Sequence, residues 1–271
     1  MTRTSFIGLF CATLLAPIAC GDSGGPDAPR SDAAAGDGGP RIDGGGGVSR
    51  CGDDVCEGVE TANNCCEDCG CGEGESCSAG ACSCVARYDV TYSTDLAAEQ
   101  PVCDGTSETF GPNCNAAINR WCSGRGCATT GFGPAEHSGD SADVVCLDAV
   151  VVLTSFGELG GFDGGCTSDN PYSLECNHAA HLLCAADDST TGFGLLENGG
   201  DIAVGCTPDA RLVTTTYAAL SGLHPGCDGT PPGMGDSCNA AINRLCQQRG
   251  AVSGFGPVDV ASPTVTVACV P

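Results

Sequence analysis

The chain contains 271 residues, including 24 cysteines and 42 glycines, whereas aromatic residues make up only 5%. So few large side chains would form a thin apolar core, and we therefore expect disulfide bonds to supply much of the stability. The chain has ten basic residues and 34 carboxylates, which gives a formal net charge of −24. Because this charge repels phosphate backbones and anionic lipid surfaces, composition argues against nucleic acid as a partner.

Residues 1–19 are typical of a secretory signal peptide, because one positive charge precedes a short apolar run. That run is too short to cross about 30 Å of hydrocarbon as a helix. It ends in Ala16-Pro17-Ile18-Ala19-Cys20, which resembles a bacterial lipobox except at Pro17, where leucine is usual. The resemblance implies that Cys20 carries lipid, and Gly21 behind it favours the outer membrane. A plain signal peptide and a secreted protein are the alternative.

Residues 20–50 are predicted to form a disordered linker that tethers the folded part to the lipid anchor. Positions 21–50 hold ten glycines and five aspartates, and they have too little apolar surface to offset chain entropy. A coil of this length reaches roughly 30 Å. The run Gly21–Pro26 matches the nucleophile motif of chymotrypsin-like proteases. A nucleophilic serine needs a rigid pocket and a nearby base, however, and a linker offers neither.

Residues 51–85 hold nine cysteines, which predicts a small knot held by disulfides. Metal binding is the alternative, since Cys66-Glu-Asp-Cys69 has the spacing of zinc ligands, but an oxidising compartment favours disulfides. The run from Cys51-Gly-Asp-Asp-Val-Cys56 onward is similar to small Cys-rich modules of bacterial surface proteins. The run Cys71–Cys84 resembles the closing hairpin of EGF-like knots.

Carboxylates in the same knot are candidate ligands for calcium, which prefers several oxygen atoms. The candidates are Asp53, Asp54, Glu57, Glu60, Glu67 and Asp68. A solvated acidic surface is the alternative interpretation. Calcium is the one cofactor that the sequence suggests.

Three short helices are predicted from a pattern that recurs along the chain, at Cys114–Cys122, Cys176–Cys184 and Cys238–Cys246. In each copy, apolar or cysteine residues fall at positions i, i+3, i+4, i+7 and i+8, which is one stripe of an α-helix. Each helix therefore carries a cysteine at both ends of its buried face.

Strands are predicted on both sides of each helix, with a Gly-Phe-Gly turn between the helix and the second strand. We therefore predict an α+β fold with three disulfide-stapled β-α-β repeats of about 60 residues. The repeats are residues 86–148, 149–209 and 210–271. Two arrangements remain open: a closed pseudo-threefold assembly, or three small domains in a row.

Each repeat has four cysteines at shared positions. A continuous helix would place its two cysteines about 12 Å apart, too far to bond to each other. Two connectivities remain, and in both of them one helix end is bonded to a loop and the other to the second strand. The twelve cysteines are Cys103, Cys114, Cys122, Cys146, Cys166, Cys176, Cys184, Cys206, Cys227, Cys238, Cys246 and Cys269. Because the knot holds an odd number, we predict that the remaining Cys127 bonds to it.

Candidate binding residues recur in the repeats. Phe132, Phe193 and Phe255 are either exposed platforms for sugar rings or core residues on tight turns. Arg120 and Arg244 share a helix face with Asn119 and Asn243, where they either grip carboxylates or glycans or are simply solvated. Asn115, Asn177 and Asn239 are expected to satisfy N–H groups of the first helical turn.

No catalytic constellation is evident, because the four histidines never share one position in all three copies. His178 and His181 could share a metal on their helix, but the sequence offers no third ligand. Our leading hypothesis is a non-enzymatic cell-surface lipoprotein whose repeats bind glycan or protein. It would contact the membrane through its lipid anchor alone. The alternatives are a structural envelope spacer, and a secreted hydrolase or an inhibitor of one.

Overall fold

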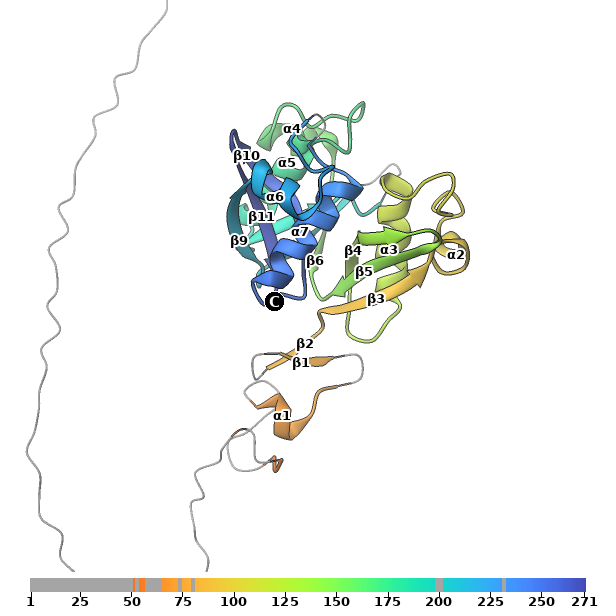
Figure 1. Cartoon of the computed structure of the whole chain (residues 1–271), viewed down its shortest axis with the longest axis vertical. Coiled ribbons are helices and arrows are strands. Elements are labelled where there is room, and N and C mark those ends of the chain that lie inside the picture. Colours follow the sequence, from red (N-terminus) through yellow and green to blue (C-terminus); the bar gives the residue numbers. More distant parts are fainter. Residues whose placement is uncertain are drawn as a thin grey trace, which may run out of the picture. The chain divides into compact units, whose positions relative to one another are not determined.

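The computed structural model describes residues 51, 54–56, 65–72, 75–78, 81–197, 202–230 and 233–271 (Figure 1). The described residues belong to one compact unit. The predicted signal peptide, the lipidated Cys20 and the linker 20–50 lie outside the described residues. The candidate calcium ligands Asp53, Glu57 and Glu60 lie outside them as well.

The Cys-rich segment contains a short helix, α1 (Cys66–Cys69), and a two-stranded antiparallel sheet of β1 (Ser76–Ser78) and β2 (Ala81–Ser83). Disulfides cross-link these small elements. The bonds join Cys51 to Cys65, Cys56 to Cys69, Cys66 to Cys77 and Cys71 to Cys82. The ninth cysteine of the segment, Cys84, bonds to Cys127 of the first repeat.

The rest of the chain folds into three repeats with the same order of elements. The first has β3 (Ala86–Thr91), the π-helical turn η1 (Tyr92–Leu96), α2 (Ala97–Glu99), α3 (Pro112–Ser123), β4 (Thr130–Ser138) and β5 (Ser141–Leu147). The second has β6 (Val150–Thr154), α4 (Phe156–Phe162), α5 (Leu174–Ala186), β7 (Thr191–Gly194) and β8 (Ile202–Thr207). The third has β9 (Arg211–Thr216), α6 (Tyr217–Leu223), α7 (Asp236–Gln248), β10 (Ser253–Ala261) and β11 (Thr264–Val270).

The predicted α+β class is confirmed, and the structure adds two elements to each repeat. A short helical segment follows the first strand. The Gly-Phe-Gly motif forms part of a strand and is not a turn: Gly131 and Phe132 pair with Cys146 and Val145. The predicted turn was wrong because glycine has a steric role at this position, which is described below.

Each repeat forms a three-stranded antiparallel sheet whose central strand is the last in sequence. The strand orders are β3-β5-β4, β6-β8-β7 and β9-β11-β10. The long helix packs on its own sheet and is tied to it by a disulfide from its C-terminal cysteine to the central strand. A second disulfide ties its N-terminal cysteine to the preceding loop, which is one of the two connectivities that the helix length leaves open.

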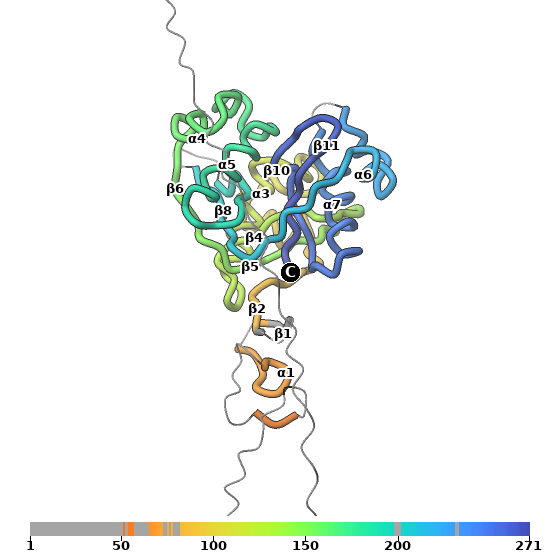
Figure 2. The backbone as a smooth tube through the Cα atoms, turned by 90° about the vertical axis from the view of Figure 1, so that its left-hand side faces the viewer, coloured from red at the N-terminus to blue at the C-terminus, as the bar shows by residue number. Residues whose placement is uncertain are grey.

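Both faces of each central strand are buried. In β5, Val144 and Cys146 face helix α3, whereas Val145 and Leu147 face a core that all three repeats share. The two faces of β8 and β11 also divide between their own helix and the shared core, to which β8 contributes Ala203 and β11 contributes Ala268 and Val270. The three repeats therefore lie side by side around a common apolar centre (Figure 2).

Candidate functional site

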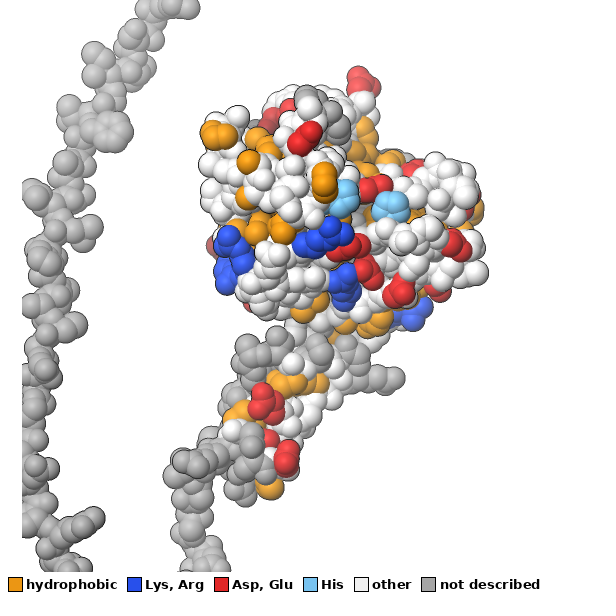
Figure 3. Space-filling model, in the orientation of Figure 1, with side chains coloured by type: hydrophobic (Ala, Val, Ile, Leu, Met, Phe, Trp, Pro, Cys, Tyr) orange, Lys and Arg blue, Asp and Glu red, His pale blue; other side chains and the backbone are white. Residues whose placement is uncertain are grey.

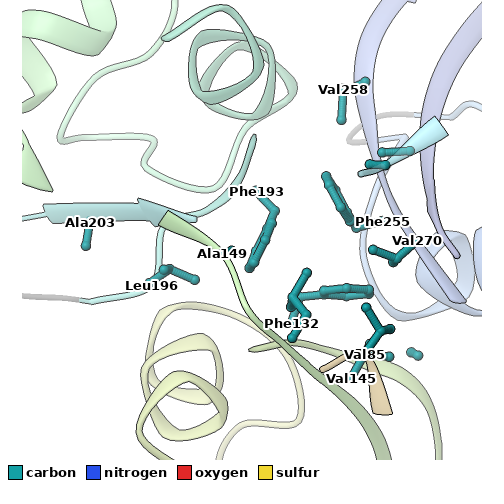
Figure 4. Packing of buried hydrophobic residues seen from close by; sticks show 14 residues of the cluster. Val85, Phe132, Val145, Ala149, Phe193, Leu196, Ala203, Phe255, Val258 and Val270 are labelled. Atoms are coloured by element: carbon teal, nitrogen blue, oxygen red, sulfur yellow. The ribbon is translucent and has the colours of Figure 1, made fainter. Parts of the chain in front are cut away.

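The three phenylalanines of the Gly-Phe-Gly motifs meet at this centre (Figure 4). The ring centroids of Phe132 lie 5.4 Å from Phe193 and 5.1 Å from Phe255, and Phe193 lies 5.0 Å from Phe255. None of the three side chains is more than 9% exposed. The hypothesis of exposed platforms for sugar rings is therefore wrong, because the rings bury one another. We call the three residues the phenylalanine cluster.

The glycines on either side of each phenylalanine allow this packing. A Cβ atom added at Gly131 would lie 2.3 Å from Sγ of Cys122, so the disulfide between α3 and β5 leaves no room for a side chain. Gly192 and Gly254 meet the same obstacle in the other repeats. The second glycine has a positive φ, +151° at Gly133, a conformation that residues with a Cβ atom rarely adopt.

A pocket that opens to solvent adjoins the phenylalanine cluster. It draws equivalent residues from all three repeats, so we call it the axial pocket. Phe110, Tyr172 and Met234, each four residues before the first cysteine of a long helix, contribute two aromatic rings and a thioether. Asn115, Asn177 and Asn239, each directly after that cysteine, contribute three carboxamides. The phenylalanine cluster, its glycines and four further residues complete the described lining: Pro134, Ala135, Leu196 and Val258.

Two of the three asparagines join neighbouring repeats. Asn115 Nδ2 donates to the carbonyl oxygen of Leu195 in the second repeat (3.2 Å), and Asn239 Nδ2 donates to that of Pro134 in the first (3.1 Å). The expectation that these side chains serve the first helical turn is therefore wrong for Asn115 and Asn239. The Asn177 side chain makes no hydrogen bond to another described residue, so its donors and its acceptor remain available.

The two candidate arginines bind carboxylates that belong to the same chain and not to a ligand. Arg120 Nε donates to Glu197 in the second repeat (3.2 Å), and Arg244 Nε donates to Glu136 in the first (3.0 Å). Asn119 and Asn243 donate to the same two carboxylates. Because these partners are internal, Arg120 and Arg244 are not free to grip a ligand. Arginine and acidic side chains lie next to one another on one face of the molecule (Figure 3).

The contact between the second and third repeats differs. His181 and Leu182 of α5 occupy the positions of Asn119 and Arg120, and the facing carboxylate is Asp259 of β10. His178 Nδ1 lies 2.9 Å from Asp163, while its Nε2 lies 4.0 Å from Asp259. His181 Nδ1 lies 2.9 Å from the hydroxyl of Thr191.

The polar groups of the axial pocket are uncharged at neutral pH. Burial, together with the negative charges of Glu108 and Glu197, raises the pKa of the Tyr172 hydroxyl. That residue therefore stays neutral, and the nearby carboxylates disfavour an anionic ligand. The described residues of the lining include no histidine, carboxylate or cysteine side chain, so they present hydrogen-bonding and apolar surfaces to a ligand.

The described residues form no set of free ligands for calcium or zinc. Asp68 accepts a hydrogen bond from the backbone N–H of Asp54 (2.9 Å), and Glu67 is exposed. Among the described residues, every group compact enough to hold an ion includes cysteines that are in disulfides. His178 and His181 do not belong to such a group.

Two spacings shared by the repeats mark these residues in the sequence. The aromatic and thioether residues lie four positions before a helical cysteine. A carboxylate lies four positions after the phenylalanine of each Gly-Phe-Gly motif, and in the first two repeats an arginine binds it. Neither spacing says that the side chains face each other across different repeats. That information lies only in the fold.

Comparison with known proteins gives no relative. No family model matches the chain, no curated protein matches it, and no solved structure matches it. Within the described residues, no helix has both the length and the apolarity needed to cross a membrane. The many disulfides indicate an oxidising environment such as the outside of the cell.

Proposed function

We propose that the three repeats form a single binding module for a neutral glycan, with the axial pocket as its site. The observation that carries this proposal is the convergence of Phe110, Tyr172 and the three asparagines on one open pocket. Aromatic rings supply apolar faces against which a sugar ring packs, and carboxamides supply both donors and acceptors for its hydroxyls. A concave apolar site with a few polar groups is the usual form of a small-molecule site.

The arrangement supports one site per chain and not three. The repeats contribute different side chains at equivalent positions, and of the three asparagines only Asn177 has a side chain without a hydrogen bond within the described part of the chain. The resulting pocket is asymmetric, because Phe110, Tyr172 and Met234 differ at one shared position, and this suits a ligand with distinct ends. We further propose that the module is an exported surface lipoprotein anchored through Cys20, which fits the disulfide content and the lipobox-like sequence.

Two side chains test the site without disturbing the fold. Asn177→Ala removes a carboxamide that makes no hydrogen bond to another described residue, and Tyr172→Phe removes one hydroxyl. Each lost hydrogen bond to a glycan should weaken binding by about 1 kcal/mol, or roughly fivefold. Asn170→Ala is the matched control, because Asn170 is exposed and does not line the pocket.

The measurement begins with a glycan array on the oxidised protein, followed by calorimetric titration of the strongest hit with each variant. Weaker binding by both pocket variants, with binding by the control unchanged, supports the proposal. If no neutral glycan binds, or if both pocket variants bind as tightly as wild type, the axial pocket is not a glycan site.

A further inference from the structure

The three contacts between neighbouring repeats provide an internal comparison. Two of them are closed by an arginine and an asparagine of a long helix that donate to a glutamate of the next repeat. The third lies between α5 of the second repeat and β10 of the third, and we call it the α5–β10 seam. It has neither the arginine nor the glutamate.

His181 replaces the asparagine in a specific way. In the first and third repeats, the hydroxyls of Thr130 and Ser253 donate to the asparagine oxygen, while the amide nitrogen faces the glutamate of the next repeat. Thr191, which is fully buried, occupies the position of these hydroxyl residues and lies against Nδ1 of His181. By this equivalence, the Thr191 hydroxyl donates to an unprotonated Nδ1, and the imidazole is neutral.

The carboxylate across the seam is a poor substitute for glutamate. Asp259 is one methylene shorter than Glu136 or Glu197, and no hydrogen bond joins it to His181 among the described contacts. Leu182 provides no charge in place of the arginine. The seam therefore lacks the charge-assisted bonds that close the other two contacts.

We propose that the α5–β10 seam is an acid-sensitive joint, which is closed while His181 is neutral and loosens when His181 takes up a proton. A proton on Nδ1 removes the acceptor of the buried Thr191 hydroxyl and places a charge in a half-buried position. The charged groups that face His181 are His178 on its own helix and Asp259 on β10, while β7 contributes only the uncharged Thr191. Asp163, after α4, faces His178.

The electrostatic environment of His181 supports opening of the seam at acidic pH. Burial, and secondarily the neighbouring His178, lowers the pKa of His181 below its ordinary value of 6.5, whereas Asp259 acts in the opposite sense. A group whose pKa is lower in the closed state takes up its proton more readily in the open state. Acidification through and below pH 6.5 therefore favours the open seam.

The test is hydrogen exchange of the full, oxidised chain at about pH 7.5 and about pH 5, corrected for intrinsic exchange rates. The amides of α5 and β10 should lose protection by several fold at the lower pH, and those of α3 and α7 much less. The double variant His181→Asn/Leu182→Arg restores the asparagine and arginine that the helix supplies at the other two contacts, and it removes the titrating imidazole, so it should abolish the difference. The single variant His181→Asn is the milder alternative, and His224→Asn removes a histidine elsewhere as the control.

An equal loss of protection in wild type and in both His181 variants would overturn the proposal, and so would equal protection of α5 at the two pH values.

The seam has one consequence for binding. Asn177 lies one turn before His181 on α5 and lines the axial pocket, so opening the seam would weaken ligand binding at acidic pH. This consequence rests on the proposed function, whereas the exchange experiment does not.

Discussion

The guanidinium of Arg244 and the carboxylate of Glu136 form a paired contact, with Nε 3.0 Å from Oε1 and Nη2 2.8 Å from Oε2. The two residues lie 108 positions apart, in the last repeat and the first. Arg244 also donates through Nη1 to the carbonyl oxygen of Leu223 (2.8 Å), which fixes the guanidinium in its own repeat. The contact therefore closes a ring, because it joins the end of the repeat array to its beginning.

Replacement of Arg244 should weaken this closure. We expect Arg244→Leu, which introduces the residue that the second repeat has at this position, to lower the free energy of unfolding by about 1 kcal/mol. The estimate is modest because the arginine side chain is 40% exposed. Chemical denaturation of the oxidised protein at neutral pH measures the change. Arg249→Leu is the matched control, since Arg249 forms no ion pair among the described residues, and an equal effect would contradict the prediction.

The same contact predicts a pH dependence. Hydrogen bonds from Arg244, followed by its charge, lower the pKa of Glu136 below its ordinary value of 4.5. A carboxyl group with a lowered pKa in the folded state adds stability above its unfolded pKa and loses it as the pH falls through the folded value. The stability difference between wild type and Arg244→Leu should therefore be constant from neutral pH to about 5 and shrink below 4.5. A difference that persisted unchanged at about pH 2 would contradict this account.

The long helices and the first and last strands of each repeat could be predicted from sequence because their signals are local. The stripe from Cys114 to Cys122 lies within α3, and the β-branched run after Ala149 became β6. Ring closure could not be predicted, because it depends on which repeat lies against which. The side chains of Arg120 and Arg244 looked like free cations in the sequence, since their partners Glu197 and Glu136 lie 77 and 108 positions away.

The Gly-Phe-Gly motif was misinterpreted for a different reason. Glycine is typical of turns because it tolerates positive φ, but the first glycine of each motif is required by the space that a disulfide occupies. That cause is invisible until the helix and sheet are packed together. The axial pocket was missed for a similar reason, because Phe110, Tyr172 and Met234 share a position in the repeat without sharing a residue type.

Substitution of Gly131 tests the steric explanation. A Cβ atom at this position would lie 2.3 Å from the Cys122 sulfur and 2.7 Å from the carbonyl oxygen of Val145, so the disulfide or the strand must move. We expect Gly131→Ala to lower the free energy of unfolding by about 3 kcal/mol or more. Gly161→Ala in α4 is the control, because a Cβ atom there meets nothing within 4 Å and alanine favours a helix. Denaturation curves in which both variants match wild type would refute the steric argument.

Substitution within the phenylalanine cluster tests the shared core. Phe193 packs against the rings of both Phe132 and Phe255, and its side chain is 5% exposed. Phe193→Ala should therefore cost about 3–5 kcal/mol and lower the melting temperature of all three repeats together. Phe162→Ala, at a side chain that is 37% exposed, should cost about 1 kcal/mol. If the melting temperature of Phe193→Ala were that of wild type, the rings would not hold the repeats together.

The disulfides offer the last comparison. Loss of the bond between Cys122 and Cys146, through the double serine variant, should lower the free energy of unfolding by about 3 kcal/mol from chain entropy alone, and by more because both sulfurs lie in the core. A purely entropic account predicts a greater loss for the bond between Cys84 and Cys127, which closes a longer loop of 43 residues. We expect the opposite order, because Cys84 and Cys127 are only half-buried and the bond from Cys103 to Cys114 already constrains the intervening chain. Thermal unfolding followed by far-ultraviolet circular dichroism decides between the two accounts. If the melting temperature of the Cys84→Ser/Cys127→Ser protein were lower than that of the Cys122→Ser/Cys146→Ser protein, loop length would outweigh burial.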